Sequence, residues 1–251
     1  MQRPVAGAGL RVAREFSKVA AGGGGGGNVS KAATANAAAM AGPRAARIFL
    51  ASPGVVADPV VLPDPMPSVM SVDGVKSYFQ AVRSSLGNML SLRKIRKAGL
   101  EFESGAFLDE AVEIYTRMNS AFSLANRSAL REVVTEPLFA EFKRSLKDRK
   151  SGERHVWRLD RVDLRRIETV RWFQVNENQF EYAQVAVRLR THQSLAVFNP
   201  KGRLIAGRPG ESVPVHEICV FERSLKGDNG AWRYCGKIAT GDAEKKTAME
   251  E

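Results

Sequence analysis

The residue types that most often perform catalysis or bind metals are sparse in this sequence and form no recognisable pattern. None of the three histidines, His155, His192 and His216, has a second histidine four residues away, the spacing that places two metal ligands on one helix face. The only two cysteines, Cys219 and Cys235, are too few for a disulfide framework and too far apart for a Cys-x-x-Cys motif. No Gly-x-Ser-x-Gly nucleophile motif is present either. We therefore expect no enzymatic activity, no metal site and no cofactor.

Positive charge is the chemical feature that stands out. The 38 Lys and Arg residues exceed the 27 Asp and Glu residues, which gives a net charge of +11. Such an excess favours a polyanionic partner, either a nucleic acid or an anionic lipid surface. Two clusters are candidates for RNA or membrane binding. The first contains Arg83, Arg93, Lys94, Arg96 and Lys97, and the second contains Arg158, Arg161, Arg165 and Arg166.

The first cluster belongs to a basic amphipathic helix predicted over residues 73–100. Apolar residues from Tyr78 to Leu90 recur at the i, i+3, i+4 spacing of one helix face. Cations in a last turn complement the helix dipole, which accounts for one or two of them. Four together, next to Leu92 and Ile95, form a basic amphipathic end that suits phosphates or anionic lipid headgroups. A solvated helix face is the alternative interpretation.

The second cluster lies in an arginine-rich segment, residues 154–171. The planar guanidinium of arginine fits a phosphate group well, and Trp157 and Trp172 could stack on nucleotides. Acidic residues alternate with these arginines, so a mixed-charge solvated surface is the alternative. No helix-turn-helix, zinc-finger or aromatic RNA-binding signature is present, and the charges therefore predict contact with the RNA backbone, without base recognition.

The ends of the chain predict segments outside the folded domain. Residues 1–50 contain seven basic residues and the single acid Glu15, with many alanines and glycines. This composition is typical of a mitochondrial or plastid transit peptide; a disordered tail is the alternative. Five prolines make residues 51–72 an extended linker, and residues 241–251 form a charged C-terminal tail. No window approaches the roughly 18 apolar residues of a membrane span.

Between these segments, helical periodicity precedes strand alternation. Helices are expected at about 107–125, 126–134 and 136–146, with a hydroxyl cap from Thr135, and the first clear strand is expected at Val170. This order predicts an α+β domain over 101–240, with helices packed on one face of a curved antiparallel sheet.

A last hairpin is predicted around a loop at 226–230. Its symmetry would place Cys219 opposite Cys235 as two free thiols, Glu217 opposite Lys237, and Val220 facing Tyr234 on the core side.

Several stretches resemble the mitochondrial large-subunit ribosomal proteins of the Tim44-like family. The resemblance covers roughly residues 77–240 and is most specific in the strands. It is carried by Thr-Val-Arg-Trp at 169–172, Val-Arg-Leu-Arg-Thr-His-Gln-Ser-Leu-Ala-Val-Phe at 187–198, Gly-Arg-Leu-Ile-Ala-Gly at 202–207, Val-Phe-Glu-Arg at 220–223, Ala-Trp-Arg at 231–233 and Leu-Arg-Glu-Val-Val-Thr-Glu at 130–136.

This resemblance implies a cone of helices on a curved sheet, the nuclear transport factor two-like architecture. It implies a structural protein of the mitochondrial large ribosomal subunit near the polypeptide exit, bound to large-subunit rRNA and neighbouring ribosomal proteins. It also implies a location in the matrix, peripheral to the inner membrane, where the protein helps to tether the ribosome close to the insertion machinery. The two basic clusters are the residues expected to make these contacts.

Two other functions are consistent with the same fold. An inner-membrane protein-import adaptor of the Tim44 type would carry a long charged coiled coil before the domain, whereas only about 25 residues separate the linker from the second predicted helix here. An enzyme of the cone fold would need Asp, His or Tyr side chains in the concave pocket. The inward positions that the strand alternation assigns are mostly Val, Leu and Trp, which disfavours the enzyme.

Overall fold

The fold is known from a computed structural model that describes residues 52–56, 72–175, 180–225 and 230–238. Within 72–83 the side chains of residues 72–80, 82 and 83 are not described. The predicted leader, most of the linker and the C-terminal tail lie outside the described residues. In the described chain, four helices pack with a five-stranded antiparallel sheet, which confirms the predicted α+β class.

The helices come first in the chain, as predicted. They are α4 (Val72–Lys97), α5 (Ser104–Ser123), α6 (Arg127–Val133) and α7 (Glu136–Asp148). Asn126 caps α6, because its side chain accepts a hydrogen bond from the backbone N–H of Ala129. Thr135 occupies the N-cap position of α7, but its hydroxyl does not cap the helix, contrary to our prediction. Its backbone N–H donates instead to the carbonyl of Tyr234 at 2.9 Å, which ties the start of α7 to the sheet.

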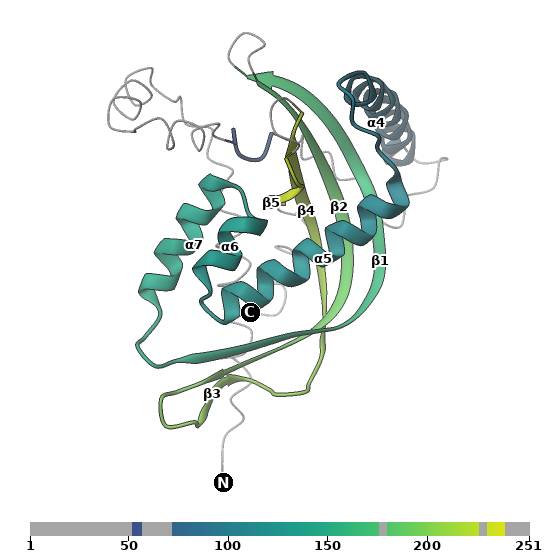
Figure 1. Cartoon of the computed structure of the whole chain (residues 1–251). Coiled ribbons are helices and arrows are strands. Elements are labelled where there is room, and N and C mark those ends of the chain that lie inside the picture. Colours follow the sequence, from purple (N-terminus) through teal and green to yellow (C-terminus); the bar gives the residue numbers. More distant parts are fainter. Residues whose placement is uncertain (1–51, 57–71, 176–179, 226–229, 239–251) are drawn as a thin grey trace, which may run out of the picture.

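The sheet curves around α5, α6 and α7 (Figure 1). Its strands are β1 (Arg154–Val175), β2 (Phe180–Phe198), β3 (Leu204–Gly207), β4 (Val213–Ser224) and β5 (Arg233–Ile238). They lie in the order β1-β2-β4-β5, and the short β3 pairs with the far end of β2. We call the side that faces these three helices the inner face and the opposite side the outer face.

Strand β1 is 22 residues long and starts well before Val170, where the first strand was predicted. Three bulges interrupt its pairing with β2, and the extra residue at each is an acid: Asp160, Asp163 and Glu168. Each extra residue shifts the inside–outside alternation by one position, so no continuous period of two is visible in the sequence. Bulges also bend a strand, which contributes to the curvature of the sheet around the helices.

The main core lies between the inner face and the helices. Phe107 of α5 stands at its centre, with its ring centroid 4.7 Å from that of Trp232 and 6.0 Å from that of Phe221. Edge-to-face contacts of this kind add to the apolar area that the rings bury. A smaller apolar cluster lies on the outer face and consists of Ala186, Ile218, Val220, Cys235 and Ile238.

The pairing of β4 with β5 differs from the predicted register. Cys219 lies opposite Lys237, and Phe221, not Val220, lies opposite Tyr234. A bulge leaves Cys235 unpaired and sends it to the outer face, whereas Cys219 points into the main core. The two cysteines are free, as predicted, but they lie on opposite faces and do not face each other. Glu217 and Lys237 still form an ion pair, diagonally across the strands.

Part of the predicted linker packs on the sheet. Residues Ser52–Val56 have no regular structure of their own, yet Val55 packs on the outer-face cluster. The Ser52 hydroxyl donates to the Glu222 carboxylate at 3.0 Å, and the Gln184 amide donates to the same oxygen at 2.8 Å. Glu222 is therefore buried between the sheet and this segment.

The burial of Glu222 predicts a pH dependence. Desolvation is the main cause that raises the pKa of this carboxyl above its usual value, and the hydrogen bonds to it offset only part of the shift. The folded state then binds a proton that the unfolded chain has lost, so the free energy of unfolding falls as pH rises from the ordinary carboxyl pKa through the raised one. Glu222→Gln should flatten this fall in denaturant unfolding measured between pH 4 and pH 8. Parallel curves for the two proteins would contradict it.

Candidate anion-binding site

Helix α4 lies along the free edge of β1, and Asn88 fixes it there. The Asn88 side chain accepts from the Val170 backbone N–H at 2.9 Å and donates to the Glu168 carbonyl at 3.3 Å. One of these backbone groups belongs to the bulge residue and the other lies two residues on, so the amide satisfies two polar groups of an edge strand. Ile95, which is fully buried, anchors the end of the helix in the main core.

The opposite side of α4 exposes a row of large apolar residues. Leu86, Met89 and Leu90 are 54%, 53% and 56% exposed, although they belong to the apolar face predicted from the sequence. Their spacing of i, i+3, i+4 places them on one face. The residues that turn toward the core are Leu92 and Ile95, from another side of the helix. The described part of α4 therefore has two apolar sides, and one of them is open to solvent.

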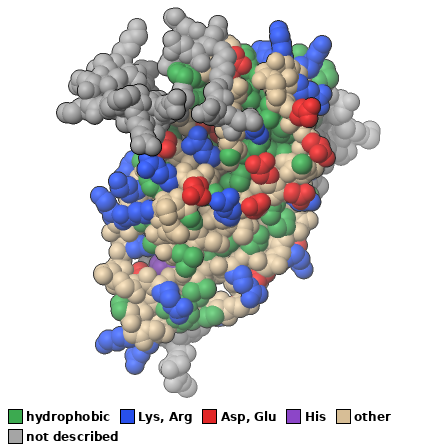
Figure 2. Space-filling model, viewed as in Figure 1, with side chains coloured by type: hydrophobic (Ala, Val, Ile, Leu, Met, Phe, Trp, Pro, Cys, Tyr) green, Lys and Arg blue, Asp and Glu red, His purple; other side chains and the backbone are tan. Residues whose placement is uncertain are grey.

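The first basic cluster continues this exposed row. Arg93, Lys94, Arg96 and Lys97 are all exposed, and none of them forms an ion pair with another described residue. The structure thus brings together four of the five residues predicted in this cluster. Arg83 lies on the same helix, but its side chain is outside the described set. Basic side chains gather beside apolar ones at the end of the molecule where α4 lies (Figure 2).

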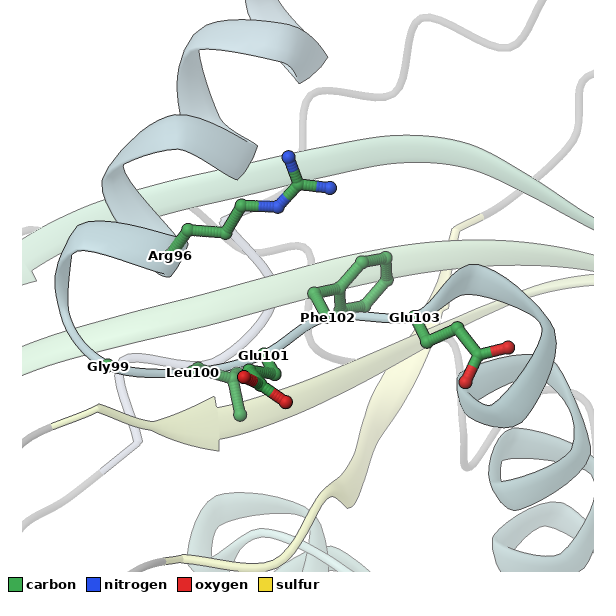
Figure 3. A pocket seen from close by; sticks show the side chains of 6 residues that line it. All are labelled: Arg96, Gly99, Leu100, Glu101, Phe102 and Glu103. Carbon is green, nitrogen blue, oxygen red and sulfur yellow. The ribbon is translucent and has the colours of Figure 1, made fainter.

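Two shallow grooves flank the basic end. One, of about 430 Å³, is lined by Lys94, Lys97 and Trp172 among others, and the Lys94 ammonium lies 4.2 Å from the centre of the Trp172 ring. This cation–π contact fixes the position of the lysine without neutralising it. The other, of about 450 Å³, lies where α4 ends, and its lining is shown in Figure 3. There the carboxylates of Glu101 and Glu103 point away from Arg96.

The second basic cluster is differently arranged, because each of its arginines pairs with an acid. Arg158 contacts Asp160 and Arg161 contacts Asp163, both at 2.5 Å. Arg166 contacts Glu168 at 2.9 Å. In these three cases the acid is the extra residue of a bulge, two positions after its arginine. The fourth, Arg165, pairs with Asp109 of α5. The structure places all four on β1, as a row whose charge is largely compensated.

The inner face holds a polar network that sequence reasoning missed. The Tyr115 hydroxyl donates to Glu217 at 2.6 Å and accepts from the Gln193 amide at 2.6 Å, and Gln193 accepts from the Trp157 indole at 2.8 Å. Lys237 pairs with the other Glu217 oxygen. Burial and the adjacent Glu217 raise the pKa of Tyr115 well above its usual value, so the hydroxyl keeps its proton and donates.

This network does not form a reactive centre. The Glu217 carboxylate and the Tyr115 hydroxyl are each bonded to other side chains of the network, so both are held by the protein itself. The groups come from α5 and from strands β1, β2, β4 and β5. We infer that the network locks α5 onto the inner face. Two features of the sequence could have indicated this network. They are Tyr115 on the apolar side of the predicted helix and the predicted pairing of Glu217 with Lys237.

The histidines are not arranged as metal ligands. His192 lies 3.0 Å from the Asp163 carboxylate and 3.1 Å from the Arg161 guanidinium. Over the described ranges, no group of three or more His, Cys, Asp or Glu side chains is placed to hold a metal ion.

The helices of the same ranges include none that combines the length and the apolar character needed to cross a bilayer.

Comparison with known proteins gives one family and a set of similar proteins. A family model described as the Tim44-like domain matches residues 89–239. The Drosophila melanogaster protein named large ribosomal subunit protein mL45 is 28% identical over 68% of this chain and 46% of its own length. The Xenopus tropicalis protein of the same name is 29% identical over 79% of this chain and 64% of its own length. This chain thus spans about half to two thirds of these relatives.

A solved structure is also matched, at low sequence identity. The intermembrane space region of chloroplast protein ARC6 aligns over 56% of this chain and all of its own, at 14% identity and a TM-score of 0.35.

Proposed function

The chain belongs to the Tim44-like domain family, and from this premise we propose that it is a structural, non-catalytic component of the large subunit of the mitochondrial ribosome. Its similarity to proteins named large ribosomal subunit protein mL45 supports this proposal. We further propose that it lies near the polypeptide exit, in the matrix and peripheral to the inner membrane. There it would contact large-subunit rRNA and neighbouring ribosomal proteins and help to tether the ribosome to the membrane.

The observation that carries the membrane part of the proposal is the exposed side of α4. Leu86, Met89 and Leu90 form an apolar row, and Arg93 and Lys97 continue the same face toward the end of the helix. A helix with this pattern lies in the plane of a bilayer surface, with its apolar residues at the acyl boundary and its cations among the headgroups. The sequence has no acid between Gly74 and Leu100, so from Gly74 onward no side chain of the helix repels an anionic surface.

The rRNA contact is assigned to both basic clusters, with unequal shares. Each of the four arginines of the second cluster already pairs with a carboxylate, so a phosphate must compete with an intramolecular partner. The α4 cations have no such competitor among the described residues. An exposed ion pair contributes about 0–1 kcal/mol, so this competition weakens a phosphate contact without preventing it. We therefore assign the larger share of phosphate binding to α4.

Sedimentation of an organelle lysate tests the class of protein. The lysate is run through a sucrose gradient with and without magnesium, and fractions are blotted for this protein. The protein should migrate with the large subunit after low magnesium has separated the subunits. Remaining at the top of the gradient, or pelleting with membranes alone, would contradict a ribosomal role and favour the import adaptor.

A further inference from the structure

The outer face of the sheet contains a buried receptor for Ser52–Val56. Gln184 is fully buried. Both the oxygen and the nitrogen of its side-chain amide form hydrogen bonds with the backbone of this segment. Its oxygen accepts from the Val56 N–H at 2.9 Å, and its nitrogen donates to the Gly54 carbonyl at 2.7 Å. These are the two kinds of bond that an adjacent strand would provide. Gln184 therefore holds the segment through its backbone, independently of the segment's side chains.

Ser52, at the start of the segment, covers the thiol of Cys235. The Ser52 hydroxyl donates to Glu222 at 3.0 Å and lies 3.9 Å from the sulfur of Cys235. Ser52 is 9% exposed, and Val55 packs on the apolar cluster that contains Cys235. Burial raises the pKa of the Cys235 thiol, which makes it a poor nucleophile while it is covered.

We propose that Ser52–Val56 is a permanent strap of the mature domain and that proteolytic removal of the N-terminal leader occurs before Ser52. Only the leader part rests on the proposed function. The cut is an ordinary hydrolysis: water adds across one peptide bond, which leaves a new carboxylate on the leader and a new amine on the domain. A cut after Ser52 would take one hydrogen-bond donor from the buried Glu222, and a cut after Val56 would also uncover the apolar cluster.

Alkylation of Cys235 tests the strap in the full-length chain. Gly54 has a φ of +80°, and an added Cβ would meet nothing within 4 Å, so Gly54→Val strains the strap mainly through its backbone conformation. With N-ethylmaleimide and mass spectrometry, the variant should react about tenfold faster than wild type at Cys235, because strain increases local opening. Cys219, buried on the inner face, should react at the same slow rate in both proteins.

Gly210→Val is the matched control. Gly210 has a φ of +78° and equally open space, but it lies in the turn before β4 and not in the strap. This variant should leave the Cys235 rate unchanged. The strap is refuted if Cys235 reacts as slowly in Gly54→Val as in wild type, or if wild-type Cys235 reacts as fast as it does in the urea-unfolded chain.

The N-terminus of the mature protein tests the processing limit. The full-length chain is imported into isolated mitochondria, recovered, and its first residue determined by mass spectrometry. The mature chain should begin at or before Ser52, and a start at residue 53 or later overturns the proposal. A chain that is imported and keeps Met1 refutes leader removal. A chain that is not imported contradicts the mitochondrial location in the proposed function, and the alkylation result then decides the strap by itself.

Discussion

Replacing the four cations at the end of α4 with glutamine is expected to weaken binding of the protein to anionic vesicles by about a thousandfold at low salt. Each Lys or Arg near an anionic membrane surface contributes about 1 kcal/mol, so four contribute roughly 4 kcal/mol. The variant carries Arg93→Gln, Lys94→Gln, Arg96→Gln and Lys97→Gln. Glutamine is a good helix former, so α4 should persist. Vesicle co-sedimentation over a series of salt concentrations measures the effect.

The β1 row provides a control of equal charge. The control variant carries Arg158→Gln, Arg161→Gln, Arg165→Gln and Arg166→Gln. Because each of these arginines already faces an acid, their loss should weaken vesicle binding less than about tenfold. Equal losses in the two variants would mean that net charge alone drives binding and would contradict the assignment to α4.

Lipid and RNA are both proposed to bind the exposed side of α4, and binding assays with neutral vesicles and with RNA distinguish them. Wild type should bind neutral vesicles weakly, through Leu86, Met89 and Leu90 alone. Leu86→Gln, Met89→Gln and Leu90→Gln together should reduce vesicle binding and leave binding to large-subunit rRNA unchanged, since phosphate contacts do not need an apolar row. An equal loss for RNA would show that the row acts by holding the helix and not by entering lipid.

The helices could be predicted from the sequence because their signals are local. The apolar period of α5 and the short helix expected at 126–134 each depend on neighbouring residues, and the structure confirms both helices. The basic end of α4 was found for the same reason, since its cations are adjacent in sequence. The exposure of Leu86 was not predictable, because an apolar helical face does not say which partner covers it.

The strands were predictable only where their alternation is unbroken. In β2, Val185, Val187 and Leu189 keep one unbroken register, so their alternation is visible in the sequence. In β1 each bulge adds one residue, and the bulged acids Asp160 and Asp163 therefore appeared to belong to a charged surface. The bulge at Cys235 moved this residue to the outer face in the same way. Bulges depend on the partner strand, which a single strand's sequence does not contain.

The strap was missed for a related reason. The prolines in residues 51–72 indicate a linker without a regular element of its own, and Ser52–Val56 has no regular structure. What the pattern omits is the receptor, because Gln184 and Glu222 lie more than a hundred residues away. A segment without regular structure can still belong to the fold when distant side chains satisfy its backbone groups.

The substitution Lys237→Met is expected to lower the free energy of unfolding strongly, although it leaves the apolar core intact. Lys237 and Glu217 are 11% and 13% exposed, and they pair on the inner face beside Tyr115. Lys237→Met keeps most of the apolar stem but leaves the Glu217 carboxylate buried with one hydroxyl donor. Removing one partner of a buried ion pair costs about 3–5 kcal/mol, because the remaining charge is uncompensated. Denaturant unfolding at pH 7 measures the loss.

The double variant Lys237→Met/Glu217→Gln separates charge from packing. The amide oxygen that Glu217→Gln introduces can still accept from the Tyr115 hydroxyl, and no charge remains, so most of the lost stability should return. If the double variant is as unstable as Lys237→Met, the lysine acts through its packing. A loss below about 1 kcal/mol in Lys237→Met would place the pair in the range of exposed ion pairs. In that case the network would not be what holds α5 on the inner face.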